Sequence, residues 1–106
     1  MAKKELRPQV MDALSSEFDA VFDKFTDDLS RVKGWSPKSV FKVIFIILDA
    51  VPEMVPSWMM ATPDEREAAV VTRVNEHINM PIFNEPQEAV IIHIAYHAIL
   101  PFLGLL

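Results

Sequence analysis

The chain has 106 residues, a formal net charge of −5 and no cysteine, so it suits one domain without a disulfide framework, a thiolate nucleophile or a cysteine-based metal site. The acidic balance argues against nucleic acid as a partner, because proteins that bind it usually carry a basic stripe. Apolar residues make up 51% of the chain, which predicts a tightly buried bundle or one that shares apolar surface with another chain.

The first helix is expected over residues 8–33, where apolar side chains recur at three- and four-residue steps on one face. Pro8 opens it, at a position where the missing amide hydrogen of proline costs nothing. Gly34 is expected as a left-handed C-cap, with Trp35 folding back onto Leu29. Three aspartates four residues apart predict a solvated face or, alternatively, a surface for a divalent cation or a basic partner: Asp19, Asp23 and Asp27.

The second helix is expected over residues 37–50, with Ser36 as its N-cap and Pro37 as its first residue. The segment is apolar almost all round, which is typical of a central helix, and Phe45 lies within its narrow polar stripe. Its β-branched residues would also fit a strand, but the length of the run and the cap signal favour a helix.

A kinked connector is expected over residues 51–62, because Pro52 and Pro56 interrupt this stretch, with one short helical turn around residues 57–60. The connector is unusually apolar and includes Trp58, Met59 and Met60. Two interpretations remain open for it. The connector either folds over the bundle and closes the core, or it exposes a patch that meets a partner.

The third helix is expected over residues 63–79, because the segment 62–65, Thr-Pro-Asp-Glu, has the form of a capping box. A linker at residues 80–83 leads to the last helix, which is expected over residues 86–104. Pro101 should kink this helix or end it early. The predicted fold is therefore all-α: a single domain over residues 1–106 that forms a compact bundle of four main helices with a short kinked or helical connector.

The last 18 residues, 89–106, carry no charge, which is the lower edge of the length that spans a membrane. Against a span, His93 and His97 lie within the run, Pro101 interrupts it, and no Lys or Arg flanks it. We expect a core or interface helix, with membrane association as the alternative. The N-terminus lacks a signal-peptide pattern, so a cytoplasmic location is expected.

His93 and His97 are four residues apart and therefore share one face of the last helix, the spacing at which two imidazoles can bind one metal ion. A third ligand would have to come from His77, Glu85 or Glu88, if the fold brought one of them close. The favoured interpretation is that both histidines line the solvated edge of a mostly buried helix. No metal or cofactor is predicted, and His93 and His97 stay as secondary metal candidates.

The chain has no nucleophile motif and no glycine-rich phosphate loop, so no catalytic residue and no enzyme is predicted. The apolar content that a small core cannot absorb predicts a non-enzymatic interaction or assembly module, as a homo-oligomer or bound to a protein partner. A membrane-associated protein and a small metal- or ligand-binding protein are the alternatives. The expected partner contacts are Phe45, Trp58, Met59, Met60 and Tyr96.

Overall fold

The computed structural model describes residues 6–31, 36–77 and 84–105, and it confirms the predicted all-helical fold. No strand occurs in these ranges. The radius of gyration is 13.4 Å, which matches the value of about 13 Å for a compact domain of this length. The helices are α1 (Pro8–Lys24), α2 (Thr26–Ser30), α3 (Pro37–Asp49), α4 (Val51–Met54), the 3₁₀ helix η1 (Pro56–Met60), α5 (Pro63–His77) and α6 (Glu85–Phe102).

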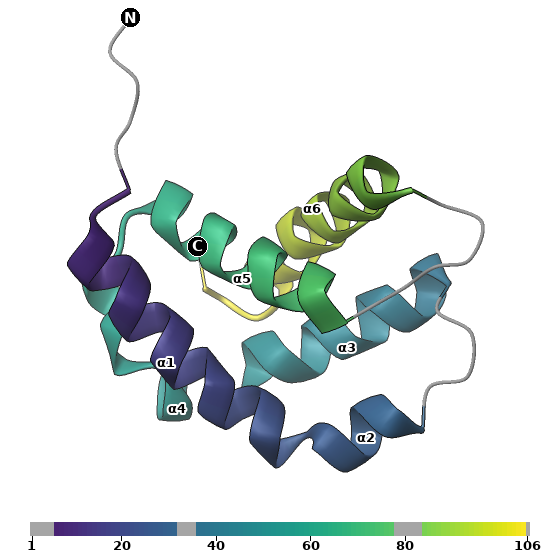
Figure 1. Ribbon diagram of the computed structural model, residues 1–106, viewed down its shortest axis with the longest axis horizontal. Coiled ribbons are helices and arrows are strands. Elements are labelled where there is room, and N and C mark those ends of the chain that lie inside the picture. The colour runs from purple at the N-terminus through teal and green to yellow at the C-terminus, as the bar shows by residue number, and fades with distance from the viewer. Residues whose placement is uncertain (1–5, 32–35, 78–83, 106) are drawn as a thin grey trace, which may run out of the picture.

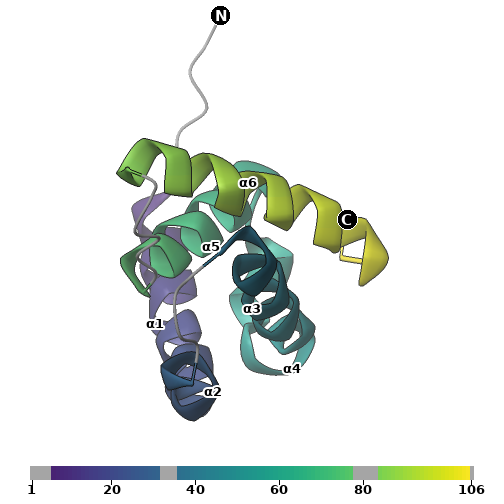
Figure 2. The same cartoon turned by 90° about the vertical axis from the view of Figure 1, so that its right-hand side faces the viewer.

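The four longer helices pack in a layered order. Figure 1 shows α5 between α1 and α6. α6 lies across α3 and α5 and packs chiefly against these two helices (Figure 2). Each of the four helices turns an apolar stripe inward, as the three- and four-residue spacing requires. Fully buried core side chains include Leu14, Phe18 and Val21 of α1, Val40, Ile44 and Leu48 of α3, Val70 of α5, and Ile92 and Ala95 of α6.

Local capping signals place the starts of the main helices within one residue of the predicted positions. Ser36 caps α3 by accepting a hydrogen bond from the third helical amide. At the start of α5, the Thr62 hydroxyl accepts from the Glu65 amide at 3.2 Å, and the Glu65 carboxylate accepts from the Thr62 amide at 2.7 Å. Asn84 and Gln87 form the same reciprocal pair at the start of α6. These bonds satisfy amides that a helix start leaves free.

The single helix expected over residues 8–33 is divided into α1 and α2 at Phe25. Phe25 has φ −102° and ψ 16°, outside the helical region. The Thr26 hydroxyl donates to the Phe22 carbonyl at 3.0 Å, and such local bonds compete with the helical ladder and bend it. The apolar periodicity continues through the break, which is why it predicted one helix. The predicted contacts of residues 34–35, and the linker at 80–83, lie outside the described residues.

The connector closes the core. η1 supplies the predicted short turn and packs against α1. Trp58 is buried, with its ring 6.1 Å from that of Phe18 in an edge-on arrangement and 6.4 Å from that of Tyr96. The Glu17 carboxylate of α1 accepts hydrogen bonds from the Ser57 amide at 2.8 Å and the Ser57 hydroxyl at 2.5 Å. The connector is therefore fastened to α1 by both polar and apolar contacts.

α6 runs through Pro101 and ends at Phe102, rather than at residue 104 as expected. Gly104 has φ +71°, a left-handed conformation that glycine adopts without steric cost. Its amide donates to the Pro101 carbonyl at 3.1 Å, and the Leu105 amide donates to the Leu100 carbonyl at 3.0 Å. This pair of bonds is a Schellman motif, which ends the helix one residue beyond the proline.

Candidate functional site

The exposed face of α6 combines two kinds of side chain and has no ammonium, guanidinium or carboxylate group between residues 86 and 102, since Glu88 is buried. Along one side lie His93 and His97, which we call the histidine edge. Along the other, at four-residue steps, lies the apolar ridge: Val90, Ile94, Ala98 and Phe102. Side chains four residues apart fall on one face of a helix, so each set forms a continuous row.

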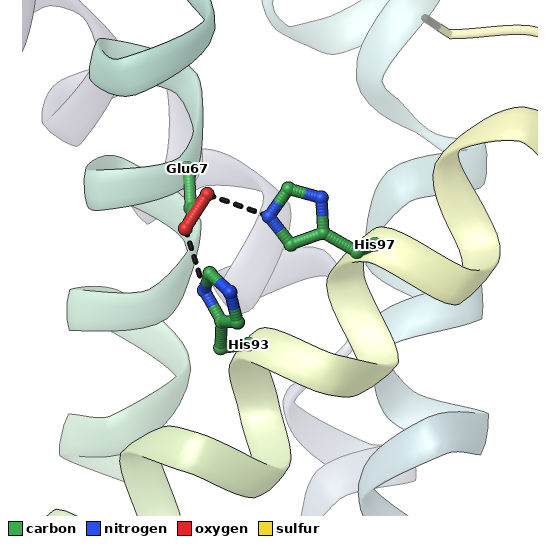
Figure 3. A group of neighbouring side chains, drawn as sticks. All are labelled: Glu67, His93 and His97. Carbon is green, nitrogen blue, oxygen red and sulfur yellow. Dashed lines mark hydrogen bonds and ion pairs between the residues drawn. The ribbon is translucent and has the colours of Figure 1, made fainter.

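The histidine edge meets a carboxylate from the neighbouring helix. Glu67 of α5 points between the two imidazoles (Figure 3). Its Oε1 lies 2.6 Å from Nδ1 of His93, and its Oε2 lies 2.7 Å from Nε2 of His97. The centroids of the two imidazole rings are 4.5 Å apart. One carboxylate therefore bridges two histidines on successive turns of α6.

This cluster lies at the surface between α5 and α6. The side chains of His93 and His97 are 52% and 53% exposed, and that of Glu67 is 25% exposed. Shallow hollows lie on both sides of the cluster, and Asp64 lines both of them, while Arg66 lines one. One ligand atom from each of the three clustered residues lies within 4.8 Å of the others. Two imidazole nitrogens and a carboxylate oxygen are a donor set that Zn²⁺ accepts.

Two of the third ligands that the sequence suggested, His77 and Glu88, are not at the cluster. The His77 ring stacks on Phe22, with centroids 4.4 Å apart, and Glu88 is buried on the core side of α6. The Glu85 side chain lies outside the described part of the chain. Sequence reasoning missed Glu67, which lies 30 residues before His97. The signal that could have found it is its position on α5, three residues before the buried Val70 and therefore close to the inward face of that helix.

The apolar ridge is open to solvent over most of its length. Val90 is 57% exposed, Ile94 53% and Phe102 79%. Beyond the ridge, the Phe102 ring contacts Phe45 of α3, with centroids 6.0 Å apart. Phe45, a predicted partner contact, is also exposed and extends the apolar surface from α6 onto α3. Between Ile94 and Phe102 the ridge is low, because its residue there is Ala98.

The other predicted partner contacts divide into two groups. Met59 and Met60 are 82% and 68% exposed on η1 and form a separate, smaller apolar surface. Trp58 and Tyr96, also predicted as partner contacts, are buried inside the protein and belong to its core rather than to its exposed surface. Both rings pack against each other in the core, where the connector covers it. Within η1, the apolar side chain of Trp58 therefore serves the fold, whereas those of the next two residues remain exposed.

The carboxylate of Glu65, also on α5, is buried and surrounded by hydrogen-bond donors. Its Oε1 accepts from Nη2 of Arg7 and its Oε2 from the Arg7 amide, both at 2.8 Å, in addition to the bond from Thr62. The Arg7 guanidinium, with the amide donors, holds the pKa of Glu65 well below its usual range. Because donors occupy both oxygens, this group serves as a clamp between the N-terminal segment and α5.

No protein-family model, curated protein or solved structure matches the chain. Within the residues that the structure describes, no helix has both the length and the apolar character needed to cross a membrane. Function is therefore inferred from the chemistry of the α6 face.

Proposed function

We propose that the protein is a non-enzymatic assembly module that pairs with a second copy of itself through the apolar ridge of α6. The observation that carries this proposal is the exposure of Val90, Ile94 and Phe102 in one row on a face without charged groups. Contiguous exposed apolar side chains on a small protein usually mark a site of interaction, because water solvates them poorly.

A second copy is the partner that best fits this ridge. The ridge itself offers no countercharge to a charged partner, and Lys42 of α3 is the charged side chain in the hollow beside Ala98 and Phe102. An identical ridge is equally apolar. In an antiparallel two-fold pair, Ile94 would lie opposite Ala98 of the second copy, and Val90 opposite Phe102. Large side chains then face smaller ones, as interdigitated helix ridges require. Two-fold dimers are also the commonest oligomers, because one patch serves both copies.

The size of the ridge sets the expected strength of the dimer. Its residues span about 18 Å along the helix axis. Burying the exposed part of each large ridge side chain contributes about 1–2 kcal/mol. Six such side chains in two copies contribute on the order of 10 kcal/mol, against an association cost of about 4 kcal/mol or more. The expected dissociation constant is therefore micromolar or weaker.

Sedimentation velocity on the untagged chain, from a few micromolar to several hundred micromolar, tests the proposal. We expect a dimer that forms with rising concentration. Ile94→Lys places a charge in the centre of the ridge and should leave a folded monomer. Ala20→Lys, at an exposed position of α1, is the matched control and should dimerise as the wild type does.

Three results would overturn the proposal. The wild type could stay monomeric over the whole concentration range. Ile94→Lys could dimerise as tightly as the control. Met59→Lys, which places the charge on the exposed surface of η1, could dissociate the dimer when Ile94→Lys does not. A wild-type chain that stays monomeric but binds neutral lipid vesicles through the ridge would favour the membrane-associated alternative instead.

A further inference from the structure

We propose that Glu67, His93 and His97 form a binding site for one divalent transition-metal ion, with Zn²⁺ as the ion that fits it best. The ligand atoms are Nδ1 of His93, Nε2 of His97 and a carboxylate oxygen of Glu67. These residues are on two different helices, so the ion would link α5 to α6. The inference does not depend on self-association through the apolar ridge.

The observed distances are close to those of a metal site. With metal–ligand bonds of about 2.0–2.1 Å, neighbouring donor atoms in a tetrahedral zinc site lie about 3.3 Å apart. The carboxylate oxygens of Glu67 now lie 2.6 Å and 2.7 Å from the two imidazole nitrogens, at hydrogen-bond length. An ion would replace the hydrogens in these contacts, so each nitrogen would move about 0.6 Å away from its carboxylate oxygen. The two imidazole nitrogens, which lie within 4.8 Å of each other, would settle about 3.3 Å apart. Small rotations of three partly exposed side chains supply this movement.

The donor set selects the kind of ion. Two imidazoles and one carboxylate suit zinc and its neighbours in the first transition series, while Ca²⁺ and Mg²⁺ prefer sites made of several oxygens. The described residues bring only one carboxylate into the cluster. Because both imidazoles are half exposed, a fourth coordination position would remain open to water. Three protein ligands and an open position distinguish this site from a closed structural zinc site.

The helix geometry prepares two of the three ligands. His93 and His97 lie one turn apart on α6, and the capping box at the start of the helix and the Schellman motif at its end define its length. The third ligand comes from α5, which packs closely against α6. Near the cluster, Asp64 adds negative charge that attracts a cation, and Arg66 adds positive charge. The Nε of Arg66 donates to the Trp58 carbonyl at 2.7 Å, which holds part of that side chain toward the connector.

Isothermal titration of the untagged protein with Zn²⁺ tests the site. We expect one ion per chain and a rise in the thermal midpoint, because an ion that binds only the folded chain stabilises it. Glu67→Gln, His93→Ala and His97→Ala should each weaken Zn²⁺ binding at least tenfold, since even the loss of a residue that only supports a ligand costs about 10–100-fold. The chain has three histidines, so His77→Ala is the matched control and should bind as the wild type does.

Two further measurements distinguish a specific metal site from adventitious binding. Co²⁺ should give the visible absorption of a site with nitrogen and oxygen ligands in the wild type, and this should disappear in His93→Ala while circular dichroism shows a folded chain. The proposal is overturned if no Zn²⁺ binds, or if the three cluster variants bind as the wild type does, which would indicate adventitious surface binding. Ile94→Lys should keep the ion while it loses the dimer, so the two proposals fail separately.

Discussion

Replacing Trp58 would show whether the connector belongs to the core or to a contact surface. In the structure, Trp58 of η1 is buried, with its ring edge-on to that of Phe18 and the guanidinium carbon of Arg66 5.3 Å from its ring centroid. Met59, the next residue, is 82% exposed. Trp58→Ala removes the buried ring, and Met59→Ala removes an exposed side chain of the same segment. The two variants therefore form a matched pair.

The expected magnitudes differ by several kcal/mol. Removing a large buried aromatic side chain costs about 3–5 kcal/mol, because both its burial and its packing contacts are lost. The lost edge contact with Phe18 and the cation–π contact with Arg66 place Trp58→Ala toward the upper end of this range. Met59→Ala should change the free energy of unfolding by less than about 0.5 kcal/mol. Small domains have about 5–15 kcal/mol in total, so the first variant loses a large share.

Urea unfolding followed by far-ultraviolet circular dichroism measures both variants. Because Trp58→Ala comes close to unfolding the chain, Trp58→Phe serves as a milder second variant that keeps a ring at this position. We expect it to lose about 1–2 kcal/mol, which lowers the thermal midpoint by about 5–15 °C. If Trp58→Ala costs no more than Met59→Ala, the connector does not close the core and the reasoning fails.

Three further predictions concern charge and capping. The pKa of Glu65 is lower in the folded than in the unfolded chain, so its stabilising effect is present above the ordinary value of 4.5 and is lost progressively as pH falls toward the depressed pKa of the folded chain. The difference between the thermal midpoints of the wild type and Glu65→Gln should therefore shrink steadily as pH falls below 4.5. A constant difference would contradict this. Asn84→Ala removes the cap that accepts from the Gln87 amide at 3.0 Å and should cost about 1 kcal/mol in urea unfolding, whereas Asn84→Ser should restore most of it. Burial, with the negative charge of Glu67 nearby, raises the pKa of Tyr96, the single tyrosine of the chain. The stabilising effect of the buried neutral phenol is lost as pH rises above the ordinary value of 10.0, so phenolate absorbance should appear only as the protein unfolds. A separate titration of Tyr96 in the folded state would refute the burial.

The sequence determined the features that depend on residues close together in the chain. Proline at the first helical turn, with Ser36, Thr62 or Asn84 before it, located the starts of three helices, because a cap bonds to amides only two or three residues away. Apolar spacing identified the inward stripe of each helix. The division at Phe25 escaped this reasoning, because the apolar pattern is the same on both sides of it.

Tertiary packing decided which large apolar side chains are accessible to solvent and which polar side chains come into contact. Trp58 and Met59 are neighbours with similar apolar character, and the packing of η1 against α1 and against Tyr96 of α6 buries the first and leaves the second exposed. His93 and His97 were recognisable as a pair from their spacing on one helix. Glu67 joins them because α5 packs beside α6 (Figure 3), and no pattern within a few residues encodes a contact between helices. The sequence therefore determined the helices and their faces, while the packing of those faces determined the candidate site.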